Sequence, residues 1–441
     1  MKKIAWLISL SFASGVAGAA DLLQTYRAAQ DNDPTFAAAR ATLDAGLEKA
    51  PQGLAGLLPS LTVSGNTVWN ETTVTSAGRT LINGEKFNSN AYTATLTQPL
   101  FRWQNWAAYG QAKLQAAQAE ASFTQARQDL ILRTAQAYFD LLTAQENLKA
   151  VQANKAAIAQ QLEQAKKNFE VGTATITDTH EAQARYDLAA AQEIAGESDL
   201  EVKRRSLQAI IGKEPGALAP ARAEVTLQPP KPANMQQWVE SAEKDAIAVQ
   251  IQQAAAEIAD KEVSRQRAGH LPTVDIVANK GKQHALAASG VLADTEIKNI
   301  GLQIVIPLFQ GGYVLSKDRE AVANRRAAES ALEAAKRGAA LAARQSYLGV
   351  VNGLAQVKAL EAGLASSKLA LESNKLGYEV GVRINIDVLN AEQQVYSTRR
   401  DLAKARYETL MAQLRLKASV GALGDDDVSA INALLDPAAA Q

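Results

Sequence analysis

The chain has 441 residues, no cysteine, three histidines, and 46 basic side chains balanced by 46 acidic ones. The lack of cysteine excludes disulfides, thiol catalysis and cysteine-based metal sites, and three histidines argue against a histidine-ligated metal centre. A net charge of zero argues against a nucleic-acid-binding protein, which would carry a basic excess. This length fits two or three domains, or one large repeated domain.

The first 20 residues have the pattern of a secretory signal peptide. Lys2 and Lys3 form a basic region, residues 4–12 are largely apolar, and Ala17-Gly18-Ala19 supplies a small-residue cleavage site. We expect residues 1–20 to be removed on export; a short buried N-terminal helix is the alternative. After residue 20 there is no apolar run of about 18 residues, which excludes an ordinary inner-membrane helical protein.

The rest of the chain shows an internal duplication at an offset of about 209 residues. The recurring pairs are Leu58-Pro59-Ser60 with Leu271-Pro272-Thr273, Pro99-Leu100-Phe101 with Pro307-Leu308-Phe309, Phe169-Glu170-Val171-Gly172 with Tyr378-Glu379-Val380-Gly381, and Ile211-Gly212 with Val420-Gly421. We predict a first structural repeat over 21–228, a Pro-rich linker over 229–233 and a second repeat over 234–424. Residues 425–441 are expected to form a disordered C-terminal tail.

Each repeat is predicted to begin with a short helical segment and a pair of strands. Apolar and polar residues alternate with period two along the strand segments, as in Tyr92, Ala94 and Leu96 against the threonines between them. Short helices are predicted over 21–50 and 235–268, strands over 61–69, 92–100, 274–276 and 300–306, and connectors over 75–90 and 281–296.

Long helices are predicted to follow the strands. No proline occurs over 103–169 or 311–377, and a helix of that length would extend about 100 Å. Second long helices are predicted over 176–211 and 384–420. Alanine is abundant in these segments, and small residues allow helices to approach closely. Each repeat is therefore predicted to carry one long helical hairpin.

Four strands per chain are too few to close a barrel, because small closed barrels need about eight strands. A trimer would supply twelve, a plausible number for an outer-membrane barrel. Aromatic residues gather at the predicted strand-to-helix junctions, either as a belt at the membrane interface or as anchors against a neighbouring helix. They are Phe101, Trp103, Trp106, Phe309 and Tyr313.

With these features, the chain resembles the TolC family of trimeric outer-membrane efflux and type I secretion channels. The motifs that carry the resemblance are Leu57-Leu58-Pro59-Ser60-Leu61, Gln98-Pro99-Leu100-Phe101, Phe169-Glu170-Val171-Gly172 with Ile176-Thr177-Asp178, His270-Leu271-Pro272-Thr273, and Gly377-Tyr378-Glu379-Val380-Gly381 through Asp387-Val388-Leu389. They occur in both halves of the chain and in the family's order.

The resemblance implies a mixed α+β membrane protein in the outer membrane of a Gram-negative bacterium. Its long coiled-coil barrel of helices would be continuous with a twelve-stranded transmembrane β-barrel built by a homotrimer, each chain giving four strands. The resemblance also implies partners, namely a periplasmic adaptor, an inner-membrane transporter and outer-membrane lipid. The expected function is an exit duct that passes drugs or secreted proteins outward, with no cofactor and no enzymatic activity.

The resemblance places a periplasmic gate at Thr177 and Asp178 in the first repeat and at Tyr378 and Arg383 in the second. In such ducts polar links between neighbouring inner helices close the periplasmic end, and loosening those helices opens it. A carboxylate can accept bonds from a tyrosine hydroxyl and from an arginine fork, and charge-assisted bonds of this kind are strong. The alternative is that Asp178 only caps the helix that starts nearby.

The resemblance also places the pore constriction at Asp387, where a trimer would form a ring of three carboxylates. Acidic rings favour cations in pores. The sequence departs from the family pattern at the second ring, because that position is the neutral Asn390. We therefore expect weaker cation selectivity, and weaker block by multivalent cations, than in a duct with two acidic rings.

The helix-to-helix turns at Val171, Gly172, Val380 and Gly381 are expected to need glycine with positive φ. The resemblance makes these tips the contact with the adaptor.

A second class of protein stays open from the residues alone, namely a pore-less trimeric coiled-coil adhesin or periplasmic scaffold. Such a protein would show sustained heptads and would need no paired strands. The isolated histidines His180, His270 and His284 and the absence of a phosphate-binding GxxxxGK[ST] motif give no support for catalysis.

Overall fold

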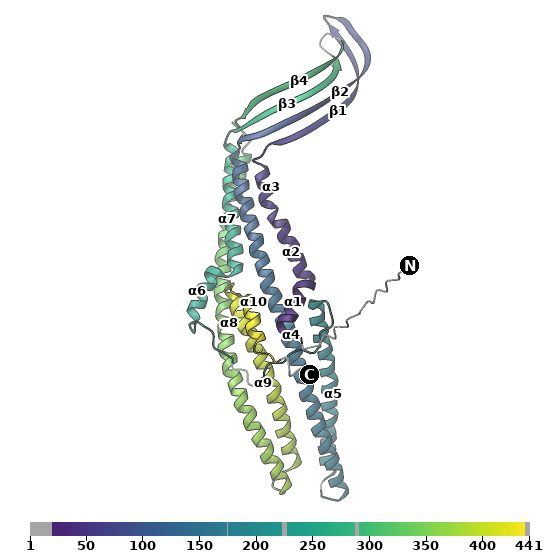
Figure 1. Cartoon of the computed structure of the whole chain (residues 1–441), viewed down its shortest axis with the longest axis vertical. Coiled ribbons are helices and arrows are strands. Elements are labelled where there is room, and N and C mark those ends of the chain that lie inside the picture. The colour runs from purple at the N-terminus through teal and green to yellow at the C-terminus, as the bar shows by residue number, and fades with distance from the viewer. Residues whose placement is uncertain (1–19, 174, 223–226, 287–290, 437–441) are drawn as a thin grey trace, which may run out of the picture. The chain divides into compact units, whose positions relative to one another are not determined.

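The computed structural model describes residues 20–173, 175–222, 227–286 and 291–436. The chain divides into two compact units (Figure 1). The sheet unit comprises Arg40–Thr124 and Ile247–Arg337, and the hairpin unit comprises the described parts of 1–39, 125–246 and 338–441. The long helices α4 (Trp103–Glu170) and α8 (Tyr313–Glu379) start in the sheet unit and end in the hairpin unit. Each unit contains elements of both predicted repeats.

The sheet unit carries one antiparallel sheet in the order β1-β2-β3-β4, which confirms two strands from each repeat. The two hairpins join side by side because β2 of the first repeat pairs with β3 of the second. On their outer sides β1 and β4 have no strand neighbour among the described residues. The strands are β1 (Ser60–Ser76), β2 (Arg79–Phe101), β3 (Thr273–Leu286) and β4 (Leu292–Val305).

The predicted connectors are wrong, because most of each one is strand. Strands β1 and β2 continue to a two-residue turn at Ala77 and Gly78, whose φ values are 50° and 78°. Two successive residues with positive φ give the twist that suits a tight hairpin. The glycines and asparagines between 75 and 90 read as loop signals, but β-forming threonine and aromatic residues interleave with them. In the predicted connector 281–296, residues 287–290 lie outside the described part of the chain.

The two faces of the sheet differ in polarity, as the period-two pattern predicted. One row of cross-strand neighbours is apolar, namely Leu61, Leu96, Ala278 and Ile300. The next row is polar, namely Thr62, Thr95, Asn279 and Asn299. Successive residues of a strand point to opposite faces, so at these rows one face is apolar and the other is hydrogen-bonding. Two residues farther along the first face, Lys280 of β3 pairs with Lys298 of β4. The exposed fractions of Leu61 (69%) and Ile300 (77%) show that the apolar face is uncovered in the single chain.

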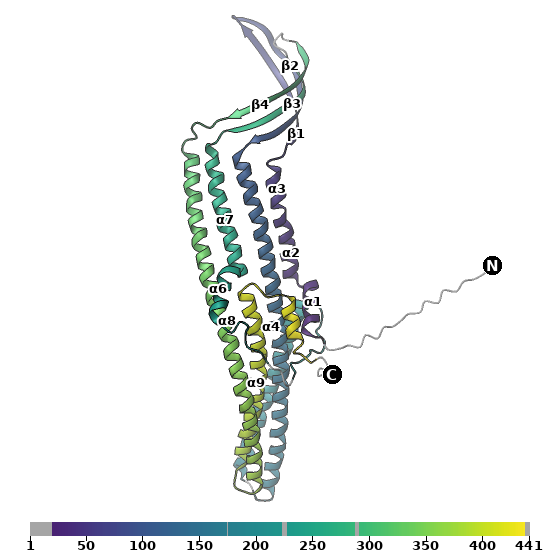
Figure 2. The same ribbon diagram turned by 60° about the vertical axis from the view of Figure 1, so that its left-hand side comes forward.

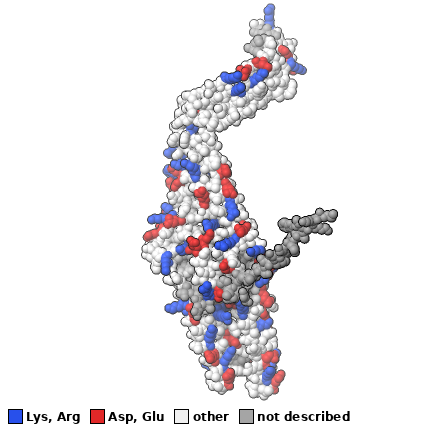
Figure 3. Space-filling view, in the orientation of Figure 1, with Lys and Arg blue, Asp and Glu red and all other residues white. Residues whose placement is uncertain are grey.

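Much of the sheet surface next to the helices is uncharged (Figure 3). In three of the four strands, residues 60–70, 87–101 and 299–305 contain no Asp, Glu, Lys or Arg. Strand β3 differs, because its Asp275, Lys280 and Lys282 pair with Pro99, Ala94 and Tyr92. A tilted strand of about ten residues crosses the hydrocarbon layer of a membrane. The uncharged runs of β1 and β2 reach that length. Among the helices of the described chain, none is both long and apolar enough for a membrane span.

Two predicted short helices are broken into shorter ones. The segment 21–50 forms α1 (Leu22–Asn32), α2 (Pro34–Leu47) and the start of α3 (Lys49–Ala55). The first break occurs because the Asp33 carboxylate accepts a bond from the Phe36 N–H at 2.7 Å and so starts a new helix, with proline at its first position. The segment 235–268 forms α6 (Met235–Asp245), α7 (Ile247–Arg267) and the start of η1 (Ala268–His270). Buried Ala246 has an extended backbone there (ψ 132°).

Within the sheet unit, two features fix the junction of strands and helices. Arg102, between β2 and α4, holds buried Asp275 of β3 with two bonds of 2.7 and 2.5 Å. Gly53 of α3 lies so close to α4 that a Cβ there would come within 2.6 Å of the Ala112 Cβ. The paired arginine fork and the close helix contact orient the start of α4 against the sheet.

In the hairpin unit, α4 is antiparallel to α5 (Ile176–Ile211) and α8 to α9 (Asn385–Ser419) (Figures 1 and 2). The predicted bounds of these four helices are confirmed to within two residues. The core where the two hairpins meet contains Tyr138, Phe139 and Tyr407, with the rings of Phe139 and Tyr407 stacked 5.4 Å apart. Burial raises the pKa of Tyr407 to about 12, and burial also raises the pKa of Tyr138.

The expectation of a disordered tail is wrong for residues 425–436. Helix α10 (Asp425–Asn432) packs against α1, and Val428, Ile431 and Leu435 are buried. Asn432 accepts a bond from the Leu23 N–H at 3.2 Å and donates one to Asp21 at 3.0 Å. These contacts order the segment, which composition alone did not indicate. Residues 437–441 and predicted signal residues 1–19 lie outside the described chain.

Candidate gate and constriction in the helical hairpins

Both helical hairpins turn through the same backbone motif at their tips. At the first tip the Thr173 N–H bonds the Asn168 carbonyl at 2.8 Å, and at the second the Val382 N–H bonds the Gly377 carbonyl at 2.8 Å. These bonds belong to the Schellman motif, which needs a left-handed residue after the helix. Gly172 (φ 80°) and Gly381 (φ 78°) supply that residue, as predicted. The valines before them, Val171 and Val380, are exposed at both tips.

Asp178 caps helix α5. Its Oδ2 accepts bonds from the N–H (2.9 Å) and hydroxyl (2.8 Å) of Thr175, and its own N–H donates to the Thr175 hydroxyl at 3.3 Å. This reciprocal arrangement is a capping box. The capping alternative for Asp178 is therefore seen in the geometry, and the bonds use only one of its two carboxylate oxygens. Thr177 is exposed beside it.

Tyr378 and Arg383 have other partners within the chain. The Tyr378 hydroxyl accepts a bond from the Asn168 side chain at 3.3 Å, which joins α8 to α4. Arg383 lies 3.6 Å from the Asp387 carboxylate. Among the described residues of one chain, neither is hydrogen-bonded or ion-paired to Asp178. A link between these side chains and Asp178 would therefore have to come from a second copy.

Asn390 at the candidate constriction is also held by an arginine. The Arg185 Nη2 of α5 donates to the Asn390 Oδ1 of α9 at 3.1 Å. Glu181, one turn before Arg185, lies 3.6 Å from the same guanidinium. Asp387 lies three residues before Asn390, on the same side of the helix. The candidate constriction therefore contains charges of both signs.

A third link joins the hairpins through a buried carboxylate. Glu392 of α9 is only 8% exposed at its side chain, and it accepts a bond from Gln161 of α4 at 2.8 Å and contacts Lys375 of α8 at 3.4 Å. Asn168, Arg185 and Glu392 were not predicted from the sequence. No local pattern marks them, because their partners on the other hairpin are 205 to 231 residues away.

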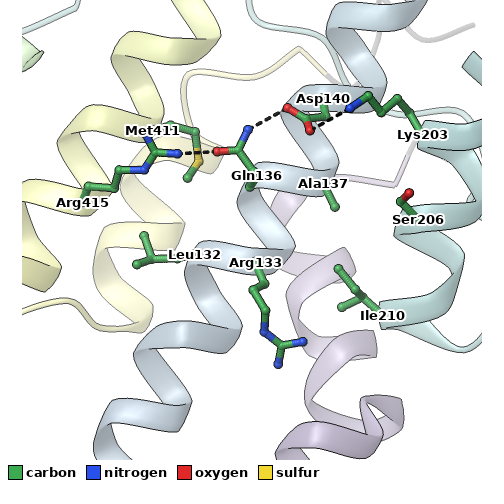
Figure 4. Close-up of a pocket in the computed structure, with 10 residues that line it drawn as sticks. All are labelled: Leu132, Arg133, Gln136, Ala137, Asp140, Lys203, Ser206, Ile210, Met411 and Arg415. Carbon is green, nitrogen blue, oxygen red and sulfur yellow. Dashed lines mark hydrogen bonds and ion pairs between the residues drawn. The ribbon is translucent and has the colours of Figure 1, made fainter. Parts of the chain in front are cut away.

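A groove across the middle of α4 contains a chain of polar contacts (Figure 4). Arg415 of α9 donates to Gln136 at 2.7 Å, Gln136 donates to Asp140 at 2.6 Å, and Lys203 of α5 donates to Asp140 at 3.3 Å. The groove has a volume of about 380 Å³. This chain of contacts connects α9 to α5 through α4, so it fixes the spacing of three helices above the tips.

An ion pair also joins α4 to α5 within one hairpin. Lys155 Nζ and Glu193 Oε2 lie 2.5 Å apart, and this bond holds the pKa of Glu193 below and that of Lys155 above its ordinary value. No group of three or more potential metal-ligating side chains lies together in the described part of the chain. His180, His270 and His284 lie in α5, in η1 and in β3. The contacts of the candidate site are hydrogen bonds and ion pairs between side chains.

The chain matches a known protein family and is similar to individual proteins of known name. The model of the "Outer membrane efflux protein" family matches residues 25–213 and 238–422, one block in each half of the chain. The chain is 31% identical over 436 residues to the "Proteases secretion protein PrtF" of Dickeya chrysanthemi, covering 97% of this chain and 94% of that protein. It is 30% identical over 441 residues to "Outer membrane protein TolC" of Vibrio cholerae, covering 98% of both.

Solved structures share the fold at lower sequence identity. The outer membrane protein VceC of Vibrio cholerae superposes with a TM-score of 0.76 at 22% identity, covering 91% of this chain and 96% of that one. The CmeC outer membrane channel of Campylobacter jejuni superposes with a TM-score of 0.78 at 17% identity, covering 94% and 90%. The long helical hairpins and the four-stranded sheet are thus features of a known architecture.

Proposed function

Because this chain belongs to the outer membrane efflux protein family, we propose that three copies of it join their sheets into one twelve-stranded barrel that opens into a tube of helices. Members of the family are channels rather than enzymes. The chain is an exit duct in the outer membrane of a Gram-negative bacterium, for efflux or type I secretion, with its long helices in the periplasm.

The observation that best supports a trimer is the four-stranded sheet, which has two unlike faces and two edges with no strand neighbour among the described residues. Open strand edges pair readily with other chains, and a head-to-tail contact that closes on itself gives a ring. Pairing β4 of one copy with β1 of the next would place the apolar face toward lipid and the polar face toward the pore. A pore-less adhesin or scaffold would have no use for such a sheet.

We place the gate at the tips of the hairpins. Thr177 and Asp178 on one copy would meet Tyr378 and Arg383 of the next. The capping bonds engage only the Oδ2 of Asp178, which leaves Oδ1 to accept a bond from a neighbouring copy. Polar links of this kind contribute about 1 kcal/mol each, which is weak enough to break when a partner pulls on the tips.

The constriction is proposed at Asp387, with Asn390 as the neutral second ring. Three carboxylates around one opening favour cations, and half the acidic charge of a two-ring duct favours them less. Replacement of Asn390 by Asp should therefore raise cation selectivity. A variant no more selective than the parent would contradict this assignment.

A periplasmic adaptor is the proposed partner at the tips, together with an inner-membrane transporter. The exposed Val171 and Val380, each beside a rigid glycine turn at Gly172 or Gly381, offer small apolar contacts to a helical hairpin of the adaptor. Both protease secretion proteins and TolC proteins occur among the relatives. The proposed cargo classes are accordingly secreted proteins and drugs, selected by the transporter.

The test is single-channel recording of the purified protein in a planar bilayer, for the parent and for Asp387→Ala. We expect discrete low-conductance openings that are cation-selective in the parent and less selective in the variant. Selectivity that does not change would remove Asp387 from the constriction.

A gate-loosened variant, Tyr378→Phe with Arg383→Ser, completes this experiment. It should conduct more than the parent because two gate links are missing. A verified trimer that stays silent in both forms would favour the scaffold reading.

A further inference from the structure

The arginine that holds Asn390 belongs to a different helical hairpin from Asn390 itself. Arg185 lies on α5 of the first hairpin, and its guanidinium crosses to α9 of the second, where Nη2 meets the Asn390 Oδ1 at 3.1 Å. Its side chain is 25% exposed, so the cation is partly shielded from solvent. This single contact places a positive charge at the level where the proposed second ring is neutral.

The charges around this point nearly cancel within each chain. Arg185 lies 3.6 Å from Glu181, and Arg383 lies 3.6 Å from Asp387. Asn390 adds no charge. Glu181 and Asp387 therefore each have one guanidinium beside them, and a ring of Asp387 side chains does not act as a bare acidic ring.

We propose that Arg185 is the residue that sets the ion selectivity of the constriction and helps to hold it closed, through its bond to Asn390. This inference rests on the proposed function, which places the constriction at Asp387 and Asn390. It adds a specificity-determining cation and a link between the hairpins within one subunit.

Two physical effects follow from the position of Arg185. A charge beside a narrow, poorly screened opening changes the local concentration of ions of each sign. Three guanidinium groups in a trimer therefore oppose the attraction of cations by Asp387. The bond to Asn390 spans two hairpins, so any opening that moves one hairpin against the other must break it.

These two effects can be separated by three variants. Arg185→Gln removes the charge and should raise the ratio of K⁺ to Cl⁻ permeability by about threefold or more. Arg185→Lys keeps the charge and should leave that ratio near the parent value. Asn390→Ala removes only the bond, so openings should become more frequent while the ratio stays within about twofold of the parent.

The experiment is reversal-potential and single-channel recording of the full-length trimer in planar bilayers under a KCl gradient. Arg205→Gln is the matched control, because Arg205 is paired with Glu201 at 2.7 Å on the same helix, about 30 Å along α5 from Arg185. It should leave both permeability ratio and opening frequency unchanged.

The outcomes separate this inference from the function on which it rests. Parent-like selectivity in a conducting Arg185→Gln trimer would overturn the inference and leave the duct intact, whereas no conductance in any variant would count against the duct. Glu181→Gln provides a second route if Arg185→Gln does not assemble. It leaves the Arg185 cation unopposed and should lower the K⁺ to Cl⁻ ratio, and an unchanged ratio would overturn the inference equally.

Discussion

The two helical hairpins turn in the same way but use the same aspartate differently. Asp178 at the start of α5 and Asp387 at the start of α9 are 209 residues apart, the offset of the duplication. The N-cap residues three positions earlier, Thr175 and Ile384, have nearly equal φ and ψ angles of −88°, 160° and −97°, 159°. Thr175 has a hydroxyl that joins Asp178 in a capping box, whereas Ile384 has none. Asp387 therefore pairs with Arg383 instead.

The difference shows how a duplicated fold can release a side chain from a structural task. One substitution at the capping position decides whether the following carboxylate is bound to its own helix or directed elsewhere. The backbone of the turn is unchanged by that choice. In the first repeat the aspartate stabilises a helix, and in the second it is available to the proposed constriction.

A third aspartate at the start of a helix, Asp33, extends the comparison. Its replacement should cause the largest loss of stability among these variants. Asp33 caps α2, its side chain is only 2% exposed, and Arg133 holds it with bonds of 3.1 and 3.3 Å. Asp33→Ala should lower the free energy of unfolding by about 2–3 kcal/mol, because it removes a buried cap and a charge-assisted pair. Urea unfolding followed by circular dichroism measures this loss.

Asp33 should also make the free energy of unfolding depend on pH. Burial alone would raise the pKa of Asp33, but bonds from Arg133 and from the backbone of Phe36 and Thr35 lower it below its ordinary value. A lowered carboxylate pKa gives stability that is present above about pH 4 and is lost as the pH falls through the folded-state pKa. Asp33→Asn should flatten that acid limb of the stability curve. A limb of unchanged slope would assign it to other groups.

The glycine turns test whether the two tips are equivalent. Gly172→Ala and Gly381→Ala should each cost about 1–2 kcal/mol, because both residues have left-handed backbones that disfavour a Cβ, and both have open space around them. Hydrogen exchange at each tip reports the local opening free energy. Clearly unequal costs at the two tips would break the equivalence of the turns.

The two aspartates should then differ in their contribution to the helices. Asp178→Ala should cost about 1 kcal/mol at the first turn of α5, because a capping box is lost. Asp387→Ala should change the first turn of α9 by less than about 0.5 kcal/mol, because only an exposed ion pair is lost. Hydrogen exchange of the two first turns makes the comparison directly, and equal costs would contradict the account of Ile384.

The smallest expected change in stability is a gain. Ile384→Thr supplies the missing hydroxyl and should stabilise the start of α9 by about 0.5 kcal/mol. It should also draw Asp387 into a capping box and so lower the K⁺ to Cl⁻ permeability ratio. Ile384→Val, which lacks the hydroxyl, is the matched control and should change neither quantity.

Local patterns in the sequence predicted the helices and turns of the hairpin unit well. The stretch from Ile176 to Ile211 is bounded by a capping residue and a glycine, and its predicted and observed ends agree. Strand ends were predicted poorly, because the residues between 75 and 90 carry both loop-forming and β-forming types. The break at Asp33 was missed, although the following proline marks a helix start.

The polar links between the hairpins were beyond reach of local patterns. Arg185 and Asn390 are 205 positions apart, and each alone reads as an ordinary exposed residue of a helix. The distance is bridged only when the two repeats pack together. Gate positions could be named from the family resemblance, but Asn168 and Glu392 could not, because their contacts with Tyr378 and Gln161 form only when the two hairpins pack together.

The capping of Asp178 also has a consequence for symmetry. Six identical repeats in a ring would present six equivalent aspartates, all capping or all free. Fusing two repeats and changing one capping residue makes neighbouring repeats inequivalent, so the proposed trimer keeps only a threefold axis. In the proposed trimer, the three Asp178 side chains would cap helices through Oδ2 and reach the gate through Oδ1, whereas the three Asp387 side chains would face the constriction with no capping role.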